Sequence, residues 1–176
     1  MTTRRELLAA GAAAALAVPA AARADTGEDR GLLEVLVRYG EALVFSYEVA
    51  LHNAPLQGRD KETLTKLRDQ VVQADDAVRA ALRRTGGTAP PRRPPAFAQL
   101  PPRIARKADR AAYLKHIVRN EEGLVSGWYA SLQKLADVKL VEAAAAFMAA
   151  GGRRLVVVRN MAGLPLLPRA FENGGP

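Results

Sequence analysis

Few residues in this chain have the types and spacing that catalysis or metal binding requires. The chain has no cysteine, which excludes disulfides, a thiol nucleophile, cysteine-ligated zinc or iron–sulfur sites and a lipid-modified cysteine. Its two histidines, His52 and His116, limit both metal and acid–base chemistry. No serine lies in a nucleophile motif, and Gly86-Gly87 leads to Pro90 rather than to the helix start of a phosphate-binding loop. Carboxylates are therefore the main candidates for chemistry.

The spacing of the carboxylates predicts different surroundings for them. Asp75 lies at helical spacing from Val71 and Val78, so we expect its side chain to point inward. Glu41 belongs to a row of acidic residues that repeats every seven positions with an arginine between them, a pattern typical of a solvated helix face. The other members of this row are Glu34, Arg38 and Glu48.

Four helical segments must position these side chains. Apolar residues recur at steps of three and four, which predicts helices at 29–52, 60–84, 108–135 and 138–161. No segment alternates with the period of a strand, so the predicted fold class is all-α. The predicted core positions are Leu36, Leu43, Tyr47, Leu51, Leu64, Leu67, Val71, Val78, Leu82, Leu114, Ile117, Val125, Trp128, Leu132 and Leu135.

Local signals predict where these helices begin and end. Asn53-Ala54-Pro55 is expected to end the first helix, and Gly86-Gly87 the second. Ala136-Asp137 predicts a short turn, with Asp137 as the N-cap of the fourth helix. Gly163, followed by a proline, is expected to end that helix.

The connection between the second and third helices, residues 85–107, carries six prolines. Such a segment is stiff, and at about 3 Å per residue it can run the length of a bundle. Two helical hairpins joined by one long crossover have the connectivity of a ferritin-like four-helix bundle, whereas an up-and-down bundle needs a short middle loop.

The first 24 residues have the order of a twin-arginine export signal. Arg4-Arg5 stands after Thr3 and before Glu6-Leu7-Leu8, and an alanine-rich apolar stretch follows as far as residue 21. Ala22 and Ala24 flank Arg23 as a small-x-small cleavage pattern, so we expect the mature chain to be residues 25–176. The stretch is too weakly apolar for a membrane span, and the predicted location is the periplasm, the cell wall or the extracellular space. The alternative is an uncleaved N-terminal helix.

The chain is basic. Its 20 arginines and 6 lysines, set against 18 acidic residues, give a formal net charge of +8. Removal of residues 1–24 takes away three arginines and one glutamate and leaves +6. The basic residues are spread along the chain, which favours solvated helix faces, although weak attraction to anionic envelope polymers or lipids is also consistent with the charge. No basic run is interleaved with aromatic residues, so nucleic acid is not an expected partner.

Several stretches together resemble the bacterial exported ferritin-like domain proteins. Gly40 to Tyr47 is similar to the first-helix motif of that family, and Glu122 to Tyr129 is similar to the third-helix motif with the same seven-residue spacing. The remaining similar stretches are Asp76 to Pro90, Leu155 to Asn160, Gly163 to Pro165 and Ala170 to Glu172. The resemblance covers most of residues 29–173 and implies a ferritin-like fold.

The family resemblance also implies a dinuclear metal site, with one Glu from each of two helices and a Glu-x-x-His pair from each of the other two. Five of the six ligand positions carry another residue, and only Glu122 matches. The five are Gly40, Gln73, Asp76, Gly151 and Arg154. Weak remnant candidates for metal binding are Glu122, Asp76, Asp75 and Glu41, while His52 and His116 fit capping or surface roles better than ligation.

These substitutions predict a bundle without its metal centre, because a buried carboxylate that lacks a metal needs a cation or a proton. We hypothesise that Arg154, at the position of the fourth-helix histidine, pairs with Glu122 or with Asp75 or Asp76. The alternative is that Arg153 and Arg154 both reach solvent. Gly151-Gly152 in the middle of a helix predicts a kink, a close approach of a neighbour, or a site released from ligand binding.

Three functions remain open on the sequence. The first is a metal-free envelope module that binds or supports other components, with no cofactor. The second is a metal-dependent oxidase, a catalase-like enzyme or an iron-handling protein, with iron or manganese in an altered site. The third is a carrier of a small apolar ligand in space left by Gly40, Gly151 and Gly152. The sequence favours a protein that is not an enzyme, and it predicts neither a partner nor an oligomeric state.

Overall fold

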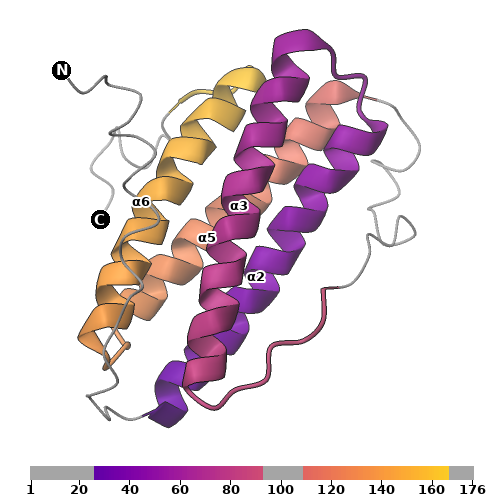
Figure 1. The fold of residues 1–176 in the computed structure, drawn as a ribbon. Helices are drawn as coiled ribbons and strands as arrows, with labels where there is room; N and C mark the ends of the chain where they lie inside the picture. Colours follow the sequence, from indigo (N-terminus) through magenta and orange to yellow (C-terminus); the bar gives the residue numbers. More distant parts are fainter. Residues whose placement is uncertain (1–25, 93–108, 167–176) are drawn as a thin grey trace, which may run out of the picture.

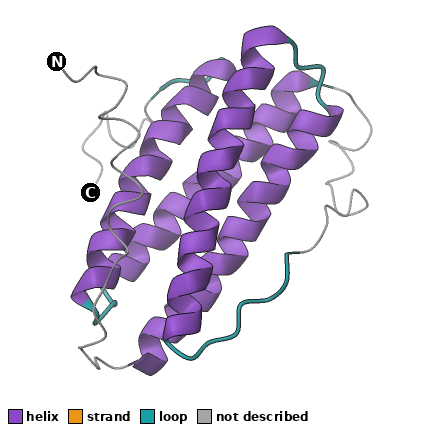
Figure 2. Ribbon diagram, in the orientation of Figure 1, coloured by secondary structure: helices purple, strands orange, loops and turns teal. Residues whose placement is uncertain are grey.

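The computed structural model describes residues 26–92 and 109–166, which form four α-helices and no strand (Figure 2). The helices pack side by side as a four-helix bundle (Figure 1). They are α2 (Thr26–Asn53), α3 (Gly58–Arg84), α5 (Arg110–Leu132) and α6 (Val138–Met161). The all-α fold class is confirmed. The predicted signal, most of the proline-rich connection and the tail after residue 166 lie outside the described residues.

Two helix ends are glycine caps at the positions that the sequence predicts. Gly86 after α3 has φ 79° and Gly163 after α6 has φ 66°, values that residues with a Cβ rarely adopt. The amide of Gly87 donates to the carbonyl of Leu82 at 2.9 Å, which satisfies a carbonyl of the last helical turn. Both helices therefore stop where glycine permits the left-handed conformation.

The third helix, α5, is shorter than predicted at both ends. The Asp109 side chain accepts a hydrogen bond from the amide of Ala111 at 2.8 Å, and this cap sets the start of the helix. Beyond its end, the buried carboxylate of Asp29 in α2 accepts the amides of Ala136 at 2.9 Å and Asp137 at 3.2 Å. That tertiary contact turns the chain towards α6, which Asp137 caps as predicted.

Contacts between helix ends fix the directions of the helices. Arg110 at the start of α5 donates from Nη2 to Asp60 Oδ2 at the start of α3 (2.6 Å) and from Nη1 to the Met161 carbonyl at the end of α6 (2.9 Å). Asp29, at the start of α2, contacts the turn after α5. Helices α3 and α5 thus run in one direction, and α2 and α6 run in the other (Figure 1). The end of α3 and the start of α5 therefore lie at opposite ends of the bundle.

Aliphatic side chains from all four helices form the core. The predicted core positions are buried, apart from Leu51, Val125 and Leu132, which are half-buried. The rings of Trp128 and Phe147 pack α5 against α6, with their centroids 5.2 Å apart. None of the described helices is apolar over enough residues to cross a membrane.

Candidate functional site

A buried ion pair joins α5 to α6 in the middle of the core. Arg154 donates from Nε to Glu121 Oε1 at 2.8 Å and from Nη2 to Glu121 Oε2 at 3.2 Å. The Tyr47 hydroxyl of α2 donates to the same Oε1 at 2.8 Å. Glu121 and Tyr47 are 0% exposed and Arg154 is 3% exposed. Three helices thus meet at one guanidinium–carboxylate–phenol cluster, in which the two-pronged contact gives a strong and directional pair.

The electrostatics of this cluster keep Tyr47 protonated. Burial raises the pKa of the Tyr47 phenol well above its usual value, and the neighbouring Glu121 carboxylate raises it further. Arg154 acts in the opposite direction as the smaller influence. A protonated phenol donates to the carboxylate, so the cluster holds one negative and one positive charge and is neutral overall.

The close approach of α6 to α5 at this level depends on Gly151. A Cβ at position 151 would lie 2.8 Å from Val125 Cγ2 and 3.5 Å from Arg154 Nη2. Its neighbour Gly152 has no atom within 4 Å of the place where a Cβ would stand. Packing therefore requires a glycine at position 151, whereas position 152 has room for a larger side chain.

This difference predicts opposite effects for two neighbouring substitutions. Gly151→Ala forces the branched Val125 side chain aside, so we expect the free energy of unfolding to fall by about 1–3 kcal/mol. Gly152→Ala adds a helix-favouring residue in open space and should raise it by up to about 1 kcal/mol. Chemical denaturation followed by circular dichroism measures both. Equal effects at the two positions would contradict the close approach at Gly151.

A second charged network joins α2, α3 and the chain after α3. Arg79 donates from Nε to Asp75 Oδ2 at 2.7 Å and from Nη2 to Glu41 Oε1 at 2.6 Å, and its Nη1 reaches the Pro90 carbonyl. Arg92 donates to the same Asp75 oxygen from Nη2 at 2.9 Å. Arg92 also contacts the Asp76 carboxylate and the Val72 carbonyl. These contacts hold the chain that leaves α3 against that helix.

Asp75 is the central residue of this second network. Its side chain is 1% exposed, and its Oδ1 has no hydrogen-bond partner among the described residues. A Cβ at residue 40 would lie 2.6 Å from that oxygen, so glycine is needed where α2 passes α3. The prediction that Asp75 points inward is confirmed.

The structure corrects the partner predicted for Arg154. Glu121, rather than Glu122, faces Arg154, while Glu122 is half-buried and pairs with Arg159. Adjacent helical residues are rotated by about 100°, so only one of two neighbouring glutamates can face the core. Asp75 and Asp76 are likewise paired with Arg79 and Arg92 rather than with Arg154. Arg153 is exposed, and only Arg154 of the two arginines faces inward.

The same one-residue rotation applies to the aromatic residue expected to match Tyr47. Tyr129 is 59% exposed, whereas Trp128 is buried. The seven-residue spacing that lies in the core is therefore Glu121 to Trp128 in α5, beside Gly40 to Tyr47 in α2. Glu121 was detectable in the sequence, since it lies at helical spacing from Ile117 and Trp128.

The residues at the level of the expected dinuclear site do not fit a metal pair. Gly40 and Gly151 have no side chain that could ligate a metal, and Arg154 brings a cation where a ligand is needed. The two buried carboxylates at this level, Asp75 and Glu121, are already paired with guanidinium groups. Within residues 26–92 and 109–166, no three His, Asp or Glu side chains are grouped so as to hold a metal ion. Glu41 and Asp76 contact arginines as well.

A smaller polar cluster joins α2 to α5, with Ser46 buried and with His116 and Asn120 half-buried. Asn120 Nδ2 donates to Ser46 Oγ at 2.6 Å and lies 3.3 Å from His116 Nε2. Burial lowers the pKa of His116, and the positive charge of Arg119 lowers it further. In the tautomer that leaves Nε2 unprotonated, a neutral imidazole accepts a hydrogen bond from the Asn120 amide there, and protonation converts that nitrogen to a donor facing the amide. His52, by contrast, is exposed at the end of α2.

This cluster predicts a stability that depends on pH. Because the folded state lowers the pKa of His116, its contribution is fully present above the unfolded value of about 6.5 and is lost as pH falls through the folded pKa. We expect the free energy of unfolding to fall more steeply below neutral pH in the native protein than in His116→Gln. Denaturation curves for the two proteins at matched pH values measure the difference, and parallel curves would refute it.

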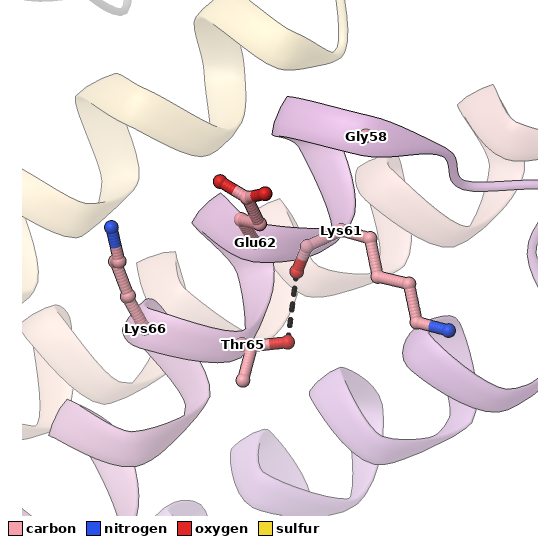
Figure 3. A pocket seen from close by; sticks show the side chains of 5 residues that line it. All are labelled: Gly58, Lys61, Glu62, Thr65 and Lys66. Carbon is pink, nitrogen blue, oxygen red and sulfur yellow. Dashed lines mark hydrogen bonds between the residues drawn. The ribbon is translucent and has the colours of Figure 1, made fainter.

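One hollow on the surface lies at the start of α3 (Figure 3). It is shallow and open, and its lining comes from a single helix, with Glu62 and Lys66 on one side and Lys61 on the other. Thr65 turns its hydroxyl back to the Lys61 carbonyl at 2.8 Å. The hollow lacks buried polar groups that converge on a ligand, so it does not define a binding site.

The fold and the charged clusters define a four-helix bundle with buried ion pairs at two of its helix interfaces. Comparison with known protein families, with curated proteins and with solved structures finds no match for this chain. The assignment of function therefore depends on the geometry of the clusters and on the sequence.

Proposed function

We propose that this protein is an exported ferritin-like bundle in which an arginine–glutamate pair takes the place of the dinuclear metal, and that it serves the cell envelope as a binding or structural module. The observation that carries the proposal is the Arg154–Glu121 pair. Its guanidinium lies where a histidine ligand is expected, and it neutralises the one core glutamate at that level. Because this cation is part of the chain, the buried carboxylate needs no bound metal to balance its charge.

The directions of the helices support the ferritin-like part of the proposal. The hairpins α2–α3 and α5–α6 are each antiparallel, and the end of α3 lies at the opposite end of the bundle from the start of α5, an arrangement that a ferritin-like topology requires. The six prolines of residues 85–107 suit a segment of that length. Export is supported by the order of the signal elements in residues 1–24, and the positive charge favours contact with anionic envelope polymers.

Close packing at two glycines bears on the carrier alternative. A Cβ at Gly40 or Gly151 would lie within 3 Å of Asp75 or Val125, so neither glycine leaves spare volume beside it. Gly152 has open space instead, but it stands outside the core, one residue away from the buried Gly151. The geometry therefore favours the module over an apolar-ligand carrier.

Metal content after reconstitution tests the proposal. The purified protein is incubated anaerobically with iron, manganese and zinc, desalted and analysed for metal per chain. We expect a folded helical protein without stoichiometric metal, in the native chain and in Glu121→Gln alike. Two metals per chain, with reaction towards oxygen or peroxide, would overturn the proposal in favour of a metal-dependent oxidase, catalase-like or iron-handling protein.

A further inference from the structure

The outer face of α6 carries fewer charges than the outer face of α3. Nine residues of α6 are exposed, and only Glu142 and Arg153 among them are charged. In α3, by contrast, every exposed residue except Gly58 is charged or a glutamine. The exposed residues of α6 are Val138, Glu142, Ala145, Ala146, Ala149, Arg153, Val156, Val157 and Asn160.

The exposed residues of α6 form one continuous stripe. They recur at steps of three and four along a helix of 24 residues, so they lie on a single side of it. Val138 is 69% exposed, Val156 39% and Val157 37%. Large aliphatic side chains at both ends and alanines in the middle form an apolar surface about 30 Å long. An exposed helix face of this length, interrupted by only two charged side chains, indicates a surface that another molecule covers.

The two charges on this stripe are self-complementary. Glu142 lies four residues after Val138, and Arg153 lies four residues before Val157. An antiparallel helix that sets Arg153 of the partner subunit opposite Glu142 therefore sets Val157 of the partner subunit opposite Val138. The same register places alanines at the centre of the stripe against alanines, which lets two helix backbones approach closely. Neither Glu142 nor Arg153 has an ion pair within the described part of the chain.

We propose that the outer face of α6 is a docking surface for α6 of a second copy of this chain, in an antiparallel two-fold dimer. Two-fold symmetry makes each contact occur twice, so the dimer contains two Glu142–Arg153 pairs across the interface. The helix lies at one edge of the bundle, where a second bundle can approach it (Figure 1). This inference does not depend on the metal-free character of the core.

Charge reversal tests the proposed register. Sedimentation velocity on the full chain over an about hundredfold range of concentration gives the dimer dissociation constant. We expect dimers in the native protein and a dissociation constant at least about tenfold higher in Glu142→Arg or Arg153→Glu, because each reversal places like charges opposite each other twice. The double variant Glu142→Arg/Arg153→Glu restores opposite charges and should bring the constant back to the native range.

A matched control lies on α3, where Glu62→Arg makes the same reversal at an exposed helical position and should leave the dissociation constant unchanged. All the altered residues are exposed, so the fold should be retained, and circular dichroism verifies this. A native chain that stays monomeric throughout overturns the proposal, including the case in which residues 1–24 cover the stripe. A double variant as weak as the single ones, or an equal effect of Glu62→Arg, overturns it too.

Discussion

Substitution of Glu121 by glutamine should lower the free energy of unfolding by about 3–5 kcal/mol, the cost of removing one partner of a buried ion pair. Glutamine keeps the size of the side chain and an oxygen that can accept from Tyr47. It removes the charge that balances Arg154, whose side chain is 4% exposed and therefore largely shielded from water. Urea denaturation followed by far-ultraviolet circular dichroism measures the loss.

The neighbouring glutamate supplies the control for this prediction. Glu122 pairs with Arg159, but its side chain is 42% exposed, so Glu122→Gln should cost less than about 1 kcal/mol. The two variants carry the same chemical change at adjacent positions of one helix. An equal cost for both would show that Glu121 is not the buried partner of Arg154.

Replacement of the whole cluster by apolar residues separates stability from the role of the charges. In the triple variant Tyr47→Phe/Glu121→Leu/Arg154→Met, no polar group of the cluster is left without a partner. Well-packed apolar residues often equal or exceed a buried ion pair in stability, so the triple variant should recover most of the loss seen in Glu121→Gln. A triple variant as unstable as Glu121→Gln would show that packing around the cluster, rather than an unpaired charge, controls the effect.

The sequence predicts the helices and their ends because those features depend on near neighbours in the chain. Glycines 86 and 163 end α3 and α6, and Asp137 caps α6, as local capping rules require. The inward direction of Asp75 follows from helical spacing alone. The end of α5 is less predictable, because it depends on Asp29, which accepts hydrogen bonds from the amides of Ala136 and Asp137 more than 100 residues further along the chain.

The sequence predicted Glu122 instead of Glu121 as the partner of Arg154 because its α5 motif was aligned on Tyr129. Reading α5 from Tyr129 selects Glu122, whereas reading it from Trp128 selects Glu121. The two aromatic residues are adjacent, and burial distinguishes them, since Trp128 is 4% exposed and Tyr129 59%. Periodicity with the apolar stripe would have given the correct register, because Leu114, Ile117 and Leu124 share the side of α5 on which Glu121 lies.

The second charged network was beyond prediction from sequence patterns. Arg79 and Asp75 are four residues apart on α3, which suggests only a helix-surface pair. Their burial depends on α2, which passes close to α3 at Gly40, and on the chain after α3, which returns to bring Arg92 to Asp75. Long flexible side chains and the course of an irregular segment are set by tertiary packing, so sequence periodicity carries no signal for them.

Substitution of Arg79 by methionine should therefore destabilise the bundle by about 3 kcal/mol or more. Methionine keeps much of the apolar stem but removes the cation that Asp75 and Glu41 share, together with the donor to the Pro90 carbonyl. Asp75, whose side chain is 1% exposed, then retains only Arg92 as a cationic partner. The Arg92 side chain is 38% exposed, so water competes for its hydrogen bonds and it neutralises Asp75 less effectively than Arg79. Chemical denaturation measures the global loss.

Arg83 is the matched control, because it lies one turn further along α3 and is exposed. Arg83→Met should cost less than about 1 kcal/mol, as expected for a cation near the end of a helix. The two variants should also differ locally. Loss of the Arg79 contact frees Pro90, so hydrogen exchange of the amides of residues 85–89 and of residue 92 should accelerate in Arg79→Met and not in Arg83→Met. If Arg79→Met is no less stable than Arg83→Met and exchange is unchanged, the buried guanidinium does not fasten the chain to α3, and Asp75 must be neutralised in another way.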